Sequence, residues 1–105
     1  MKTITHTNPN GKTVQVSVGE YVTIADGSII GEYVTICEDS TIGSHSYIGS
    51  YSYIGKHATI GKNANIGEYV TICPNAIIGK NVTIGSYSYI GKNATIAPGS
   101  IVGLK

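Results

Sequence analysis

Residues 54–72 read IGKHAT-IGKNAN-IGEYVT-I, three consecutive copies of one six-residue pattern that begins with isoleucine. The same pattern runs through most of the chain. Stepping by six from Val18 to Val102 meets only isoleucine or valine at all fifteen positions. The next residue is glycine in eleven of these hexads and alanine or cysteine in the other four. The chain is therefore a repeat protein whose unit is a hexad.

Each hexad combines a short strand with a turn. The residue two places before each aliphatic, from Val22 to Ser100, is always valine, serine or alanine. Residues two apart in a strand share a face, so both positions point inward and the residue between them points outward. A helix is excluded, because a period of six matches no helical face and glycine recurs throughout. The pattern predicts an all-β fold, a parallel β-helix in which rungs bury their apolar sides against each other.

The predicted core is the aliphatic column of the hexads. Its isoleucines are Ile24, Ile30, Ile36, Ile42, Ile48, Ile54, Ile60, Ile66, Ile72, Ile78, Ile84, Ile90 and Ile96.

Outward residues indicate that each coil has three sides. A tyrosine column and a threonine column recur at multiples of 18 residues: Tyr33, Tyr51, Tyr69, Tyr87, and Thr23, Thr41, Thr59, Thr95. Three hexads per coil predict about five coils and, at ~4.8 Å per rung, a prism on the order of 24 Å long. Residues 31–60 and 67–96 are identical at 21 of 30 positions. This indicates either a duplication of two coils or a consensus-designed sequence.

Residues 1–17 break the register and form a second predicted unit beside the β-helix of residues 18–105. Asn8-Pro9-Asn10-Gly11 lies between two runs that alternate polar and apolar residues, which predicts a β-hairpin. We expect this hairpin to cap the first coil. The last rung, near Ser100, would leave unpaired backbone groups, an edge that proteins cover or use for assembly.

Composition excludes several classes of partner. The chain has seven basic and six acidic residues and a net charge of +1, so no overall field attracts nucleic acid or an anionic membrane. The N-terminus has no apolar region of a signal peptide, and no segment reaches the length of a transmembrane helix. By default we expect a soluble protein, cytoplasmic if it comes from a cell.

Hexads such as I-G-K-N-A-T and I-G-E-Y-V-T resemble the hexapeptide repeat of the left-handed β-helix family, which includes many acyltransferases. The resemblance covers residues 18–105. It implies a left-handed coil, whereas parallel crossovers in general favour the right hand. It also implies a trimer, with acyl-coenzyme A between neighbouring prisms and a histidine as general base. Function must still be argued from a site, because one fold hosts unrelated chemistries.

His45 and His57 are the two histidines of the repeat and the candidate catalytic bases. Both occupy the third position after the aliphatic, where asparagine stands in other hexads. Asparagine and histidine are both enriched in left-handed backbone, so a plain turn role is the favoured interpretation. His6 lies in the hairpin and has no predicted role.

The sequence predicts no metal site. A zinc site like that of the γ-class carbonic anhydrases needs three converging imidazoles, but His45 and His57 fall on different corners and the chain has no arginine. Cys37 and Cys73 share a column two rungs, or ~9.6 Å, apart, beyond the ~7 Å limit for a disulfide. We also predict no cofactor.

Ice binding is a weaker alternative. The threonine column resembles the regular hydroxyl ranks of ice-binding β-helices, but Ile77 interrupts it and a second threonine rank is missing.

Charge is distributed unevenly along the predicted axis. Residues 18–53 carry a net charge of −5, residues 54–105 a net charge of +4 and the hairpin +2, which together give the total of +1. Such polarity favours head-to-tail or antiparallel contact between prisms, or it is drift on solvated corners.

These observations lead to two functional hypotheses. The first is a non-catalytic structural or scaffold β-helix, natural or consensus-designed, that self-associates, with a trimer favoured, Tyr53 and Tyr89 as outward contact candidates, and end-to-end assembly as an alternative. The second is a minimal acyltransferase, or a fragment of one, using His45 or His57.

Overall fold

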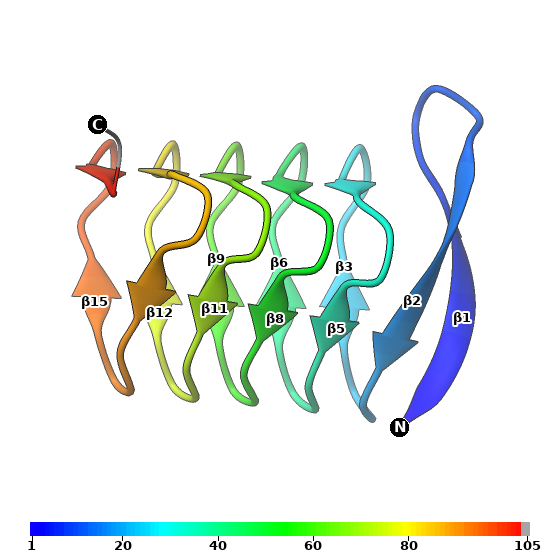
Figure 1. Cartoon of the computed structure of the whole chain (residues 1–105), viewed down its shortest axis with the longest axis horizontal. Helices are drawn as coiled ribbons and strands as arrows, with labels where there is room; N and C mark the ends of the chain where they lie inside the picture. Colours follow the sequence, from blue (N-terminus) through cyan, green and yellow to red (C-terminus); the bar gives the residue numbers. More distant parts are fainter. Residues whose placement is uncertain (104–105) are drawn as a thin grey trace.

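The computed structural model describes residues 1–103 and contains sixteen β-strands. The first two, β1 (Lys2–Thr7) and β2 (Thr13–Val18), form an antiparallel hairpin in which Lys2 pairs with Val18 and Thr7 with Thr13. Every later strand has two residues and pairs in parallel with strands 18 residues away. Figure 1 shows the result as a stack of similar coils with the hairpin at one end.

The strands form three sheets, which we call the first, second and third walls. After the hairpin, the first wall consists of β5 (Thr35–Ile36), β8 (Tyr53–Ile54), β11 (Thr71–Ile72) and β14 (Tyr89–Ile90). The second wall consists of β3 (Thr23–Ile24), β6 (Thr41–Ile42), β9 (Thr59–Ile60), β12 (Ile77–Ile78) and β15 (Thr95–Ile96). The third wall consists of β4 (Ile29–Ile30), β7 (Tyr47–Ile48), β10 (Asn65–Ile66), β13 (Thr83–Ile84) and β16 (Ile101–Val102).

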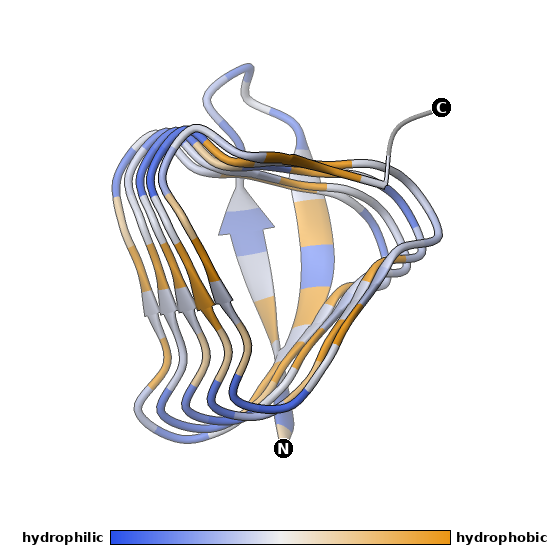
Figure 2. Ribbon diagram, turned by 90° about the vertical axis from the view of Figure 1, so that its left-hand side faces the viewer, coloured by the Kyte–Doolittle hydropathy of each residue, from blue (hydrophilic) through white to orange (hydrophobic). Residues whose placement is uncertain are grey.

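The five coils, numbered 1 to 5, begin at β2, β5, β8, β11 and β14 and take one strand from each wall. The walls meet at three corners, giving the triangular outline in Figure 2. The first corner joins the first and second walls, the second corner joins the second and third walls, and the third corner leads to the next coil. The prediction of a three-sided β-helix with about five coils and a hairpin cap is confirmed.

The aliphatic column lines the interior, as predicted. The isoleucines of this column from Ile30 to Ile84 are at most 1% exposed, and Ile90 is 4% exposed. Ile24 and Ile96 are the exceptions among the predicted core residues, because they pack against the core but remain partly exposed. They begin and end the second wall, so each has a stacking neighbour on one side only.

Serine at the second inward position is compatible with burial because its hydroxyl finds a carbonyl. Ser40 donates to Gly55 O at 2.8 Å and Ser52 donates to Gly67 O at 2.8 Å. No buried side-chain nitrogen or oxygen in residues 1–103 lacks a hydrogen-bond partner. The buried serines therefore occupy space in the core and also hydrogen-bond one coil to the next.

The hairpin caps the prism through specific contacts. Gly11, with φ of +87°, closes the turn and donates to Asn8 O at 2.8 Å. The buried Asn8 side chain then accepts a hydrogen bond from Ile30 N at 2.8 Å and donates one to Ile30 O at 3.0 Å. Asn8 thereby takes the place of a preceding strand on the third wall. The predicted boundary at residues 17 and 18 falls inside β2, which belongs to both hairpin and coil.

Candidate functional site

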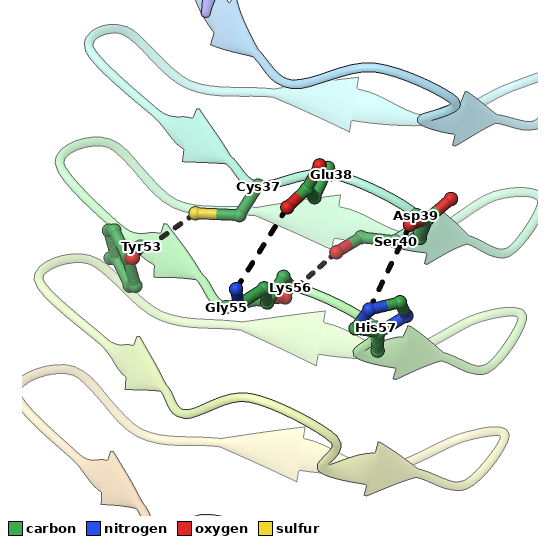
Figure 3. Close-up of polar contacts among 8 residues, drawn as sticks. All are labelled: Cys37, Glu38, Asp39, Ser40, Tyr53, Gly55, Lys56 and His57. Carbon is green, nitrogen blue, oxygen red and sulfur yellow. Dashed lines mark hydrogen bonds and ion pairs between the residues drawn. The ribbon is translucent and has the colours of Figure 1, made fainter.

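The first corner carries a group of polar side-chain contacts between coils (Figure 3). Three of these contacts link coil 2 to coil 3: Cys37 with Tyr53, Glu38 with Lys56, and Asp39 with His57. The two ion pairs follow from the period of 18, which places Glu38 and Asp39 directly above Lys56 and His57, whereas Cys37 reaches back to Tyr53 at the end of the adjacent strand. Backbone hydrogen bonds such as His57 N to Glu38 O, 3.0 Å, keep the two turns in register.

The thiol of Cys37 donates to the phenolic oxygen of Tyr53 at 3.1 Å. The adjacent sulfur of Cys37, as a hydrogen-bond partner of the hydroxyl and through its negative charge when ionised, raises the pKa of the Tyr53 phenol above its ordinary value. The same pair of residues recurs 36 residues later, where the contact with Cys73 raises the pKa of the Tyr89 phenol. Both cysteines are free thiols, so they act as small corner residues that hold the hydroxyl of an outward tyrosine.

Glu38 and Lys56 form an ion pair of 3.9 Å whose side chains are about half exposed, 55% for the lysine and 48% for the glutamate. At such exposure water screens the attraction, and the pair contributes little to stability.

The structure distinguishes the two candidate histidines. His57 Nε2 lies 3.8 Å from Asp39 Oδ2, so a carboxylate lies beside the imidazole ring. His45 has no such carboxylate; its ring lies against Gly27, where a Cβ would clash with it. His57 lies on the first corner and His45 on the second corner, so the structure does not bring them together.

Both histidines have the left-handed backbone predicted for a turn position, with φ of 59° for each. His6 also has a structural contact, 3.1 Å from its Nε2 to Ser28 O, which ties the hairpin to coil 1. Within residues 1–103, no group of three or more His, Cys, Asp or Glu side chains could hold a metal ion.

Two open depressions lie near the first corner. One, of about 480 Å³, borders the Cys37–Tyr53 and Glu38–Lys56 contacts, and Met1, Glu20 and Pro74 also line it. The other, of about 790 Å³, lies between β1 and β3 and is bordered by Ile4, His6 and Ile24. Neither is an enclosed pocket of the kind that usually excludes water around a reacting group.

The tyrosine column forms a stacked ladder on the third corner. Ring centroids of Tyr33, Tyr51, Tyr69 and Tyr87 are 5.2, 4.9 and 5.1 Å apart in order. All four have positive φ, an unusual conformation for an aromatic residue, and the stacking offsets part of its cost. Partial burial in the stack raises the pKa of the Tyr51 phenol, and the adjacent Tyr69 and Tyr33 add to the effect.

The Asp39–His57 and Cys37–Tyr53 contacts were not predicted from the sequence. The spacing could have indicated both contacts, because Asp39 and His57 are 18 residues apart, which is one coil, and Cys37 and Tyr53 are 16 residues apart, which is nearly one coil. Residues 1–103 contain no helix with the length and apolar content needed to cross a bilayer.

Comparison with known proteins places these features in a family. The model of the bacterial transferase hexapeptide (six repeats) matches residues 21–56, 39–74, 57–92 and 75–103. A comparison with curated protein sequences finds none that matches this chain.

Solved structures share the fold. A serine acetyltransferase in complex with CoA superposes with a TM-score of 0.71 at 23% identity, over 78% of this chain and 36% of the other. PerB from Caulobacter crescentus, in complex with CoA and GDP-perosamine, gives a TM-score of 0.61 at 20% identity, over 84% of this chain and 48% of PerB. The CcmM N-terminal domain, in complex with CcmN, gives a TM-score of 0.59 at 24% identity, over 86% of this chain and 97% of the CcmM domain.

The chain thus spans about a third to a half of the two transferases and nearly all of the CcmM domain. At these identities the similarity establishes the fold, including the left-handed coil, which the repeat had implied only by resemblance.

Proposed function

The chain belongs to the bacterial transferase hexapeptide family, and its fold is shared by an acetyltransferase and by a CcmM domain that was solved in complex with CcmN. We propose that it is a structural scaffold that self-associates. The observation that carries this proposal is the uninterrupted flat wall. Every coil between Val18 and Val102 has three hexads and no inserted loop, so nothing projects from the walls to complete a pocket.

Exposed apolar residues on these walls support association. Ile29 is 41% exposed and Ile101 is 68% exposed on the third wall, while Tyr53 is 42% and Tyr89 72% exposed on the first. Exposed apolar groups that lie on a regular flat surface favour contact with another protein surface. The arrangements named from the sequence are the trimer implied by the family resemblance, the end-to-end stack and an antiparallel contact between prisms.

Sedimentation equilibrium over a wide concentration range tests the proposal. A scaffold should show a mass well above the 11.0 kDa of one chain, rising with concentration. A constant mass of one chain at every concentration would overturn the proposed self-association.

Acyl transfer is a second candidate, and the Asp39–His57 contact of 3.8 Å is the observation in its favour. In this case His57 would deprotonate an amine or hydroxyl acceptor, and Asp39 would orient the imidazole. The experiment is calorimetry with acetyl-coenzyme A, followed by detection of released thiol with amine and sugar acceptors. His57→Ala should abolish turnover while His45→Ala, the matched control, retains it; absence of both binding and turnover would exclude this candidate.

A further inference from the structure

The charged side chains of the coils gather along the two edges of the second wall. The first and second corners carry four acidic residues in coils 1 and 2 and four lysines in coils 3 to 5, all exposed: Glu20, Asp26, Glu38, Asp39, and Lys56, Lys62, Lys80, Lys92. The third corner carries only Glu32 and Glu68 among residues 1–103. The second wall is therefore acidic at its N-terminal half and basic at its C-terminal half.

The surface between these edges is flat and free of charge. Its outward residues are all exposed: Thr23, Thr41, Thr59, Ile77 and Thr95. Ile77, at 49% exposure, is the large apolar side chain among them. Short side chains of this kind let a second flat surface approach closely, so the charged edges could meet their counterparts.

We propose that the second wall binds the second wall of another copy of this chain, turned end for end. This inference rests on the proposed self-association and names its surface and its symmetry. A two-fold axis parallel to the strands opposes each corner to the same corner of the other copy and inverts the order of the coils. The acidic half of each copy then faces the basic half of the other.

Parallel arrangements lose this complementarity. In a parallel pair through the second wall, equal rungs meet at equal heights, so acidic corners approach acidic corners and lysines approach lysines. Like charges brought together across an interface cost free energy and suppress that partner. At this wall the charges therefore favour an antiparallel pair over a parallel one.

The charges also select one register of the pair. Matching coil 3 with coil 3 would set Lys56 and Lys62 against their own symmetry copies. Matching coil 2 with coil 3 and coil 1 with coil 4 instead sets Asp26 opposite Lys80 and Glu38 opposite Lys56. In that register Thr23 faces Ile77, and no two like charges on these corners are directly opposed.

The Glu38–Lys56 ion pair within one chain would become part of this interface. The two side chains lie 3.9 Å apart and half exposed, and the second copy adds the same pair in reverse order. The resulting cluster alternates two carboxylates with two ammonium groups, an arrangement stronger than isolated surface pairs.

The size of the wall predicts a weak, salt-sensitive pair. The described chain measures 30 × 26 × 21 Å, so one wall offers no more than roughly 600 Å² per copy. That area is below the ~800 Å² per partner of a standard interface. Screening in ~0.5 M salt, where charges act over only a few ångströms, should therefore weaken the pair markedly.

A charge-swap series tests the surface and the register by sedimentation equilibrium. Asp26→Lys and Lys80→Glu should each weaken self-association about tenfold, because each reverses two symmetry-related pairs. The double variant should return to within about threefold of the natural chain, since the two charges exchange places across the interface. Lys12→Glu, an equal charge change on the exposed hairpin turn, is the matched control and should leave association unchanged.

The outcomes separate this inference from the proposed function. If the natural chain remains a single copy at every concentration, both fail. If it associates but neither single variant weakens association, or the double variant does not recover, the antiparallel pairing is overturned while self-association stands.

Cross-linking tests the orientation directly. In a Cys37→Ser, Cys73→Ser background, Thr23→Cys and Ile77→Cys chains would be mixed with a bis-maleimide that reaches about 10 Å, the distance between packed sheets. Thr23→Cys should link to Ile77→Cys and not to itself, because its own symmetry copy is offset by three rungs, ~14 Å along the axis. Efficient linking of Thr23→Cys to itself would show a parallel arrangement and overturn the proposal.

Discussion

The middle coils and the N-terminal hairpin bury their apolar residues in different ways. In the middle, Ile42, Ile60 and Ile78 are at most 1% exposed because identical residues stack above and below them. At the hairpin end, burial depends on single residues, above all the Asn8 contacts with Ile30. A repeat supplies its own packing partners, whereas an end needs a partner of its own.

The hairpin also covers the three walls unequally. It continues the first wall through β1 and β2 and closes the third wall through Asn8, but β3 remains an edge strand of the second wall. The 790 Å³ depression and the partial exposure of Ile24 lie at this uncovered strand. The comparison shows that a cap can be complete on two sides of a prism and open on the third.

The largest expected effect comes from a charge in the middle of the stack. Ile60→Asp should cost more than about 4 kcal/mol and unfold the central coils, because an ionised carboxylate would be buried among isoleucines. Thr59→Asp, the outward neighbour, is the control and should change stability by less than about 1 kcal/mol. Thermal melting followed by circular dichroism measures both, and an unchanged melting temperature for Ile60→Asp would refute the inward assignment.

A truncation series sharpens the contrast between middle and end. Ile60→Ala should cost about 3 kcal/mol because a cavity forms between two complete rungs. Ile96→Ala should cost about half as much, since Ile96 is already partly exposed at the end of the second wall. Urea unfolding of both variants gives the two free energies; equal losses would contradict a stack whose ends are less tightly packed.

Removing the side-chain cap tests the hairpin. Asn8→Ala should cost about 2 kcal/mol, because Ile30 loses the acceptor for its N–H and the donor to its carbonyl. Asn10→Ala, which removes an exposed contact with Lys12 N, should cost less. Hydrogen exchange at the Ile30 amide should accelerate in the first variant only, and protection that persists there would show that Asn8 is not the cap.

The smallest effect concerns pH. Tyr51, Tyr53 and Tyr89 have pKa values raised above 10.0 in the folded chain, so folding holds their protons more tightly. Their contribution to the free energy of unfolding is complete below pH ~10 and is lost as the pH rises through the folded values. Urea unfolding between pH 8 and ~11 should show this decline, and Tyr51→Phe should reduce it. A free energy that rises with pH would contradict the assignment.

Much of the fold could be predicted because the hexad is a local signal. The inward column, the three walls, the hairpin turn at Gly11 and the left-handed backbone of His45 and His57 all follow from residue type and spacing. The contact between His57 and Asp39 could not be predicted in the same way. Spacing places Asp39 one rung away, but side-chain direction at a corner depends on packing that no periodicity encodes.

The sequence by itself determined what repeats: an isoleucine in each rung, a small residue beside it and a turn every six residues, because backbone sterics and burial act identically in every hexad. Only the tertiary structure decided what does not repeat. It alone showed that Asn8 replaces a strand, that Cys37 contacts Tyr53, and that eight of the charged residues lie along the edges of the second wall. These features join residues on different coils and walls, and such contacts exist only once the chain has closed on itself.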